Sequence, residues 1–244
     1  MTSLLAQLAE DDWATQSLCP AWSVHGVVSH LAGIEMALSG WTPEGDKPAP
    51  FQQIPPFMAE AKGWSGAKLL ARFEQILAGR KTELRALSDA DFAATSWTPV
   101  GVQTYGRFMA VRVFDFWVHE QDIRVPVGHE GHLSGPAAEM SLDEVRQSFG
   151  YIAGKKAGVP DGQSVTVHLT GPITADLSAE VLGRARVVEQ LAHPTAEMTT
   201  DFLTFMLLAC GRIDPEVPIA AGKVQLSGDL TLAGQLARNL RFTF

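Results

Sequence analysis

The chain is poor in cysteine and in basic residues, and each shortage excludes a class of protein. Only two of its 244 residues are cysteine, Cys19 and Cys210, too few for the disulfide framework of a small secreted domain. Its 19 lysine and arginine residues are outnumbered by 27 aspartate and glutamate residues, which gives a net charge of −8. A general nucleic-acid-binding surface needs clustered basic side chains. We therefore expect no nucleic-acid partner.

Long apolar runs and a targeting signal are also missing from the sequence. The longest apolar runs fall well short of the roughly 18 residues that a membrane-spanning helix needs, so we expect no membrane partner. The first residues do not fit a signal peptide, because acidic residues occupy positions 10–12. These features predict a cytoplasmic protein, a monomer or a homodimer. Both cysteines are expected to be small packed residues and not nucleophiles.

The length and composition predict two domains, the first of them helical. A chain of 244 residues with 46% apolar and 19% charged residues exceeds the usual size of one compact domain. Helical patterns occur at 24–35, 65–87, 107–124 and 136–156, with a proline-rich loop at 43–56. Ser23 is the expected N-cap of the first helix. Four helices predict a bundle, which we assign to residues 1–157.

The remainder of the chain, residues 158–244, has a mixed pattern. Apolar and polar residues alternate across 165–170, as in a half-buried strand. Strands are expected at 165–170, 184–189, 223–227 and 240–244. Helices are expected at 201–210, closed by Gly211, and at 229–238. This order predicts a small α+β domain.

The most informative motif lies in the expected helix at 107–124, where Asp115 precedes His119 by four residues. Residues at i and i+4 share one helix face, so both side chains can point at one centre. His30, on the expected helix at 24–35, would complete a set of two histidines and one carboxylate. Three protein ligands leave positions open for water or a substrate sulfur, as in catalytic metal sites.

A second interpretation of these residues needs no metal. Arg112 precedes Asp115 by three residues, so the two could form a simple ion pair on the helix surface. His119 would then be a hydrogen-bonded core histidine, and His30 would be unrelated. The spacing alone leaves both interpretations open, because Asp-x3-His is a common string. Ile123 excludes a His-Glu-x-x-His metalloprotease, which has its second histidine at that position.

Two segments taken together resemble a known family. Residues 19–33 (CPAWSVHGVVSHLAG) and 112–124 (RVFDFWVHEQDIR) resemble the mycothiol-dependent maleylpyruvate isomerase family, which belongs to the DinB-like superfamily of metal-dependent proteins. The resemblance covers essentially the whole chain. It implies a DinB-like four-helix bundle followed by a small α+β domain similar to sterol carrier proteins. It also implies that His30, Asp115 and His119 bind a divalent metal, usually zinc.

The resemblance implies roles for two more residues, and the chain departs from the family pattern at a third. Asp122 matches the family motif and would orient a ligand or the substrate. The segment LACGR, which ends at Arg212, is similar to the family's Gly-Arg element, so Arg212 is expected to bind an anionic substrate group. Asp115 stands where the isomerases have glutamate, which is one methylene longer. His25 is expected to be solvated and to point away from the site, and Trp22 to be a core aromatic.

These features together predict an enzyme that uses mycothiol as a thiol cosubstrate. A coordinating thiol is deprotonated by the metal, and the thiolate is the nucleophile. It would attack a small electrophilic, carboxylate-bearing substrate, as an isomerase of the maleylpyruvate type or as an S-transferase. Two alternatives stay open: a thiol-independent metal-assisted hydrolase, and a non-enzymatic metal- or ligand-binding protein. Activity without a thiol would identify the first, and retained metal without thiol-dependent turnover the second.

Overall fold

The computed structural model describes residues 1–243, and the chain divides into two compact units, Met1–Gly131 and His132–Phe244. The expected domain boundary at residue 157 lies one helix downstream of this division. Helix α7 (Pro136–Tyr151) contacts strands of the second unit, whereas the sequence pattern assigned it to the bundle. An amphipathic pattern shows that a helix buries one face but does not show against which element.

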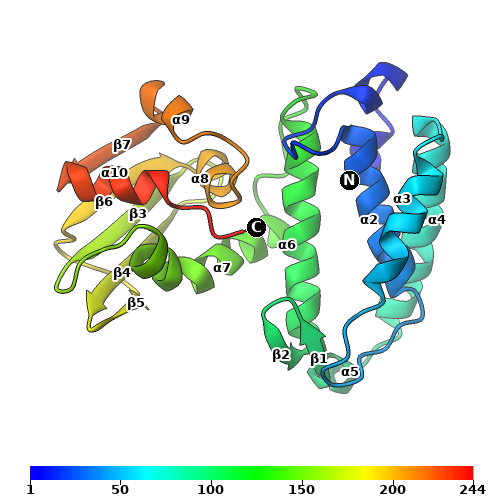
Figure 1. The fold of residues 1–244 in the computed structure, drawn as a ribbon, viewed down its shortest axis with the longest axis horizontal. Helices are drawn as coiled ribbons and strands as arrows, with labels where there is room; N and C mark the ends of the chain where they lie inside the picture. The colour runs from blue at the N-terminus through cyan, green and yellow to red at the C-terminus, as the bar shows by residue number, and fades with distance from the viewer. Residues whose placement is uncertain (244) are drawn as a thin grey trace. The chain divides into compact units, whose positions relative to one another are not determined.

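The first unit is helical except for one short hairpin (Figure 1). Helix α2 contacts α3, α4 and α6, and the hairpin strands β1 and β2 pair antiparallel. The side chains of Leu31, Leu69, Phe73 and Ile123 are fully buried within it. The elements are α1 (Thr2–Leu5), the 3-10 helix η1 (Glu10–Ala14), α2 (Val24–Leu38), the 3-10 helix η2 (Phe51–Gln53), α3 (Ile54–Ala61), α4 (Gly66–Arg85), α5 (Asp89–Ala93), β1 (Thr95–Thr98), β2 (Gly101–Thr104) and α6 (Tyr105–Arg124).

Local sequence explains where the main helices of this unit begin. The hydroxyl of Ser23 accepts a hydrogen bond from the backbone N–H of Gly26, which confirms the predicted cap of α2. Helices α4 and α6 also begin at capping hydroxyl groups. Helix α3 has Pro55 and Pro56 in its first turn, where a missing N–H costs nothing. The proline-rich segment, expected to be a loop to residue 56, therefore contains η2 and becomes α-helical at Ile54.

The second unit is built on a five-stranded sheet in the order β5-β4-β3-β6-β7. Strands β3 and β6 pair parallel, and the other neighbours pair antiparallel. Helix α7 contacts β4 and β5, α8 contacts β3 and β6, and α10 contacts β6 and β7. The remaining elements are the π-helix η3 (Ile152–Lys156), β3 (Ser164–Thr170), β4 (Ala175–Leu182), β5 (Arg184–Val188), β6 (Ala196–Asp201), α8 (Phe202–Ala209), α9 (Glu216–Ala220), β7 (Val224–Gly228) and α10 (Leu230–Arg238).

The alternation expected for residues 165–170 is present in β3 except at Thr166, which is also buried. Val165, Val167 and Leu169 are buried, while His168 on the opposite face is only partly buried and hydrogen-bonds to Asp176 and Glu197 on the two neighbouring strands. Strands β5 and β7 also follow the prediction. Strands β4 and β6 were not predicted, and the expected strand at 240–244 is not formed over the described residues 240–243.

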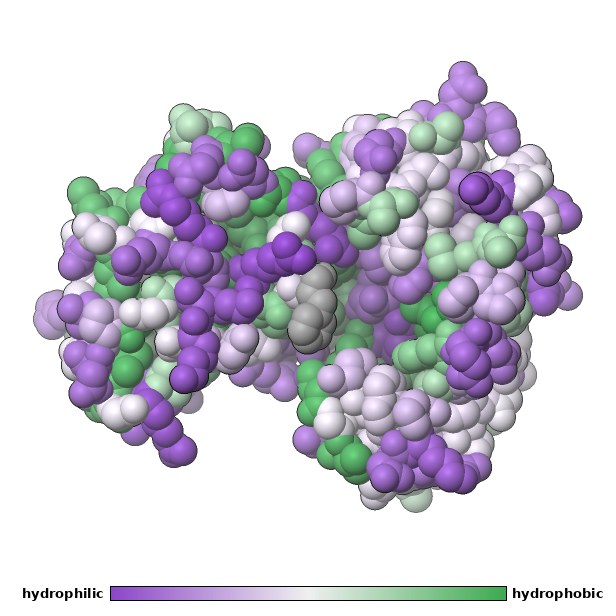
Figure 2. Space-filling view, viewed as in Figure 1, coloured by the Kyte–Doolittle hydropathy of each residue, from purple (hydrophilic) through white to green (hydrophobic). Residues whose placement is uncertain are grey.

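The predicted class, a helical N-terminal region followed by an α+β domain, is confirmed by this arrangement. On the face of the molecule shown in Figure 2, hydrophilic and hydrophobic residues are interspersed in both units. Among the helices of the described residues, none combines the length and the apolar character needed to cross a membrane.

Candidate metal centre

The three candidate metal ligands lie together in the first unit. His30 comes from α2, and Asp115 and His119 come from successive turns of α6. Each offers one ligand atom, and these atoms all lie within 4.8 Å of one another. The ring centroids of His30 and His119 are 5.2 Å apart, and His119 Nε2 lies 3.6 Å from Asp115 Oδ1. The structure therefore brings together two imidazoles and a carboxylate, a donor set that suits a divalent metal.

Asp122 fixes the orientation of the His119 ring. Its Oδ2 lies 2.8 Å from His119 Nδ1, and its side chain is completely buried. Because a carboxylate only accepts, the contact places a proton on Nδ1 and leaves the lone pair of Nε2 directed at Asp115. A histidine ligand held by a carboxylate through its other nitrogen is common at metal sites. The geometry is compatible with the supporting role predicted for Asp122.

Asp115 divides its two oxygens between different neighbours. Its Oδ2 accepts a hydrogen bond from Arg112 Nη1 at 2.6 Å, and its Oδ1 faces His119. Burial by itself would raise the pKa of Asp115, but the positive charge of Arg112, followed by the nearby imidazoles, lowers it below its ordinary value. The ion pair that seemed an alternative to a metal site thus coexists with the ligand cluster, and it keeps Asp115 ionised.

Arg112 belongs to a buried charge network that the sequence did not reveal. Arg112 Nη2 donates to Glu35 Oε1, and Arg80 Nε donates to Glu35 Oε2, both at 3.2 Å. None of the three residues exposes more than 6% of its surface. Buried charges of this kind persist only when they are paired. Glu35 therefore fixes Arg112, and Arg112 fixes Asp115.

His30 is held in the neutral state by its surroundings. Burial lowers the pKa of His30 from 6.5 to about 4, an effect only partly offset by the charge of Asp115. A neutral imidazole is the form that binds a metal. The ring of Trp22 lies against His30 with centroids 4.6 Å apart, and 6.0 Å from the ring of His119. Trp22, expected to be only a core aromatic, is thus a wall of the site.

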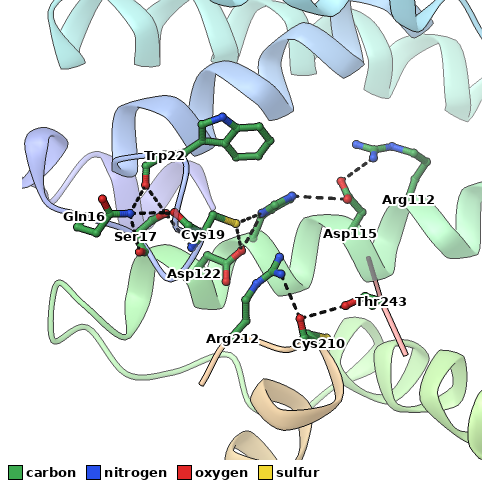
Figure 3. A network of polar contacts seen from close by, with 11 residues as sticks. Gln16, Ser17, Cys19, Trp22, Arg112, Asp115, Asp122, Cys210, Arg212 and Thr243 are labelled. Atoms are coloured by element: carbon green, nitrogen blue, oxygen red, sulfur yellow. Dashed lines mark hydrogen bonds and ion pairs between the residues drawn. The ribbon is translucent and has the colours of Figure 1, made fainter. Parts of the chain in front are cut away.

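Cys19 also contacts the site, as the close-up in Figure 3 shows. Its Sγ lies 3.0 Å from Asp122 Oδ2 and 3.7 Å from His119 Nδ1. Cys19, Asp122 and His119 form a second group with metal-ligand spacing, on the Nδ1 side of the histidine. A thiol that donates to a carboxylate satisfies both groups without an ion. Cys19 is buried as expected, but a composition argument could not show that it packs against a site residue.

Arg212 belongs to the second unit, while the other candidate residues belong to the first. It follows α8, which ends at Ala209 and is closed by Gly211 as predicted, with a positive φ of 65° at that glycine. The guanidinium donates from Nη1 to the backbone oxygen of Cys210 at 3.1 Å. Its role toward a substrate stays a prediction.

His25 differs from the expected solvated residue. It is partly buried on α2, its Nε2 lies 3.1 Å from the backbone oxygen of Trp64, and its Nδ1 lies 3.3 Å from the hydroxyl of Ser29. It does point away from the three candidate ligands, as its five-residue separation from His30 required. It lies instead in the wall of a separate cavity.

Comparison with known proteins supplies the family. The model of the mycothiol maleylpyruvate isomerase N-terminal domain matches residues 1–124. The crystal structure of the mycothiol-dependent maleylpyruvate isomerase is 16% identical, covers 93% of this chain and 86% of its own, and gives a TM-score of 0.60. A histidine-to-alanine mutant of that enzyme gives 15% identity, the same coverage and the same TM-score.

A further structural match is confined to part of the chain. Sterol carrier protein 2-like 2 from Aedes aegypti is 16% identical over 41% of this chain and 95% of its own, with a TM-score of 0.33. Among curated protein sequences, none matches the chain. At these identities the structural likeness to the isomerase shows a shared fold.

Proposed function

The chain belongs to the mycothiol maleylpyruvate isomerase family, and on this premise we propose that it is a mycothiol-dependent metalloenzyme. The observation that carries the proposal is the convergence of His30, Asp115 and His119, from two helices, within 4.8 Å. These are the residues that the family resemblance assigns to the metal. The neighbouring residues favour the protonation state and orientation that each of them needs to bind a metal.

The donor set fits a divalent metal such as zinc. His30 is neutral, Asp115 is ionised with Oδ1 turned toward His119, and His119 presents Nε2 because Asp122 occupies Nδ1. Aspartate in place of glutamate is compatible with this arrangement, since Arg112 already holds the other carboxylate oxygen. A metal held by these three side chains would keep the thiol of the cosubstrate deprotonated at neutral pH.

The chain's own residues supply orientation and substrate binding. Asp122 and Cys19 keep the ring of His119 in place, and Arg112 keeps Asp115 ionised and fixed. Trp22 packs against the ring of His30. We assign to Arg212 the binding of a substrate carboxylate, for which a guanidinium offers two parallel donors.

The proposed reaction starts with addition of the thiolate to an electrophilic carbon of the substrate. In an isomerase, addition turns a carbon–carbon double bond into a single bond, which rotates before the thiolate leaves and the double bond forms again. In an S-transferase, the adduct takes up a proton and is released as the product. Either outcome needs no thiol from the chain, which agrees with the packed environment of both cysteines.

Elemental analysis of the purified protein tests the metal assignment. We expect about one divalent metal per chain in the wild type, and loss of that metal in His30→Ala and in His119→Ala. His193→Ala is the matched control, because His193 is exposed in a loop of the second unit. Full metal content in His119→Ala would refute the ligand assignment.

Turnover assays test the rest of the proposal. Maleylpyruvate with mycothiol is the first substrate, followed by a panel of small electrophilic acids, each with and without the thiol. We expect turnover that requires both thiol and metal, and Arg212→Ala should retain the metal and lose turnover. Activity without a thiol would indicate a hydrolase, and a metal-loaded protein without turnover would indicate a binding protein.

A further inference from the structure

The first unit contains a cavity of about 600 Å³ that takes no part in holding the metal. Its walls come from η1, the start of α2, α3 and the segment that leads into α4. The volume is within the range of small-molecule sites. None of the three candidate metal ligands lines it, but Trp22 does. Trp22 therefore lines the cavity and also packs against His30, with the two ring centroids 4.6 Å apart.

Flat aromatic side chains form much of the wall. Trp13, Trp22 and Trp64 all line the cavity, and two of them depend on glycine neighbours. A Cβ atom at Gly66 would meet the ring of Trp13 at 2.4 Å, and one at Gly26 would meet Cβ of Trp22 at 2.9 Å. Larger residues at these two positions would displace the rings. The positions of Trp13 and Trp22 therefore depend on glycine at positions 66 and 26.

Polar groups stand between the aromatic side chains. Glu10 accepts a hydrogen bond from the backbone N–H of Gly66 at 3.1 Å through Oε1. Lys62 is exposed, and within the described residues its ammonium group has neither a hydrogen bond nor an ion pair. His25 and Ser29 bond to each other at 3.3 Å. The lining thus carries one carboxylate and one ammonium group, which together favour a neutral ligand rich in hydrogen-bonding groups.

We infer that this cavity binds the sugar part of the thiol cosubstrate. The inference rests on the proposed function. Mycothiol joins its cysteine to glucosamine and inositol, two neutral rings with many hydroxyl groups. Tryptophan faces suit the apolar faces of such rings, and the surrounding polar side chains suit the hydroxyl groups. Because Trp22 separates the cavity from His30, the cysteinyl arm would pass its ring to reach the metal centre.

Two substitutions test the assignment without removing a wall. Ala59→Trp places a large side chain in the cavity from an exposed position of α3, and Lys62→Met removes the unpaired ammonium group. The matched controls are Ala78→Trp and Lys81→Met, both at exposed positions of α4 outside the cavity. The probe is N-acetylglucosaminyl-inositol, which has the two rings but no thiol. Its binding is followed by tryptophan fluorescence and calorimetry.

We expect the probe to bind the wild type and both controls, with affinity reduced at least about tenfold in Ala59→Trp. The same variant should raise the KM for mycothiol by a similar factor while its metal content and kcat stay near wild type. Lys62→Met should lower the affinity for the probe and raise the KM for mycothiol, each by a smaller factor than Ala59→Trp. A probe that does not bind the wild type would overturn the assignment, as would binding and KM unchanged in Ala59→Trp.

These outcomes separate the cavity from the proposed function. Normal metal content and thiol-dependent turnover with an unchanged KM in Ala59→Trp would overturn the cavity assignment alone. Probe binding that is lost in Ala59→Trp would support the cavity assignment even in a protein that shows no turnover. Absence of metal from the wild type would overturn the proposed function, and the probe experiment would still decide what the cavity binds.

Discussion

Glu35→Gln changes the shape of the side chain very little, yet we expect it to lower the stability of the first unit strongly. The carboxylate of Glu35 accepts from Arg80 and from Arg112, each at 3.2 Å. Both guanidinium groups and the carboxylate are at least 93% buried. Glutamine keeps the volume of the side chain but supplies no negative charge. Two buried cations would then share no counter-ion at this position.

The expected cost follows from that burial. Removing one partner of a buried ion pair destabilises a protein by about 3–5 kcal/mol, because a charge is left in a poorly solvated place. Arg80 retains Glu83, and Arg112 retains Asp115, so we expect the lower half of this range. At roughly 2–4 °C per kcal/mol for a chain of this size, the unfolding midpoint should fall by about 6–16 °C.

Thermal unfolding of Glu35→Gln and of a matched control measures this cost. Glu74→Gln is the control, because Glu74 is exposed on α4, and surface substitutions change stability by about 0.5 kcal/mol or less. Metal affinity should also fall in Glu35→Gln, since Arg112, which holds Asp115, would lose its ion pair with Glu35. A midpoint within 2 °C of the Glu74→Gln control, or an unchanged metal affinity, would refute the account of Glu35 as the residue that fixes Arg112.

Two further predictions concern other contacts. Asp122→Asn should weaken metal affinity about 10–100-fold with the fold retained, measured by competition with a metal indicator; an unchanged affinity would show that Asp122 does not orient His119. Burial by itself would lower the pKa of His168, but hydrogen bonds to Glu197 and Asp176 raise it above 6.5. The resulting stabilisation is complete below pH 6.5 and disappears as the pH rises through the folded-state pKa. His168→Gln should therefore lower the unfolding midpoint more near pH 5.5 than near pH 9, and an equal loss at both would contradict the assignment.

Helical periodicity predicted the main helices, most directly α4, which buries one face with Leu69, Phe73 and Ile76. The patterns at 24–35, 65–87 and 107–124 correspond to α2, α4 and α6 with their ends shifted by two or three residues at most. Capping chemistry was equally local, as Ser23 shows. Strand β6 was missed because its pairing with β3 is a contact between distant segments that no local pattern reports. Strand β4 was missed although it has eight residues and follows β3 directly in the chain.

The surroundings of the site were missed for the same reason. Trp22, Cys19 and Glu35 each looked like an ordinary packed or surface residue in the sequence. Each acquires its role from a partner at least eight residues away: Trp22 from His30, Cys19 from Asp122, and Glu35 from Arg112. The family resemblance favoured the metal-ligand interpretation, since the spacing of Asp115 and His119 had also left a simple ion pair open.

The buried network suggests how the common Asp-x3-His string becomes specific here. Glu35 follows His30 by five residues on α2, and Arg112 precedes His119 by seven residues on α6. His30 faces His119, and Glu35 binds Arg112, so the two pairs succeed one another in opposite chain directions. This order is what antiparallel helices require.

The ion pair therefore fixes the register of α2 against α6, and that register sets His30 opposite the Asp115–His119 turn. His-x4-Glu on one helix combined with Arg-x2-Asp-x3-His on another is then a stronger indication of this site than either string alone. It ties the candidate metal ligands to a buried charge pair whose partners lie on the same two helices. A slip of α2 by one turn would break the Glu35–Arg112 pair and separate the two histidines at the same time.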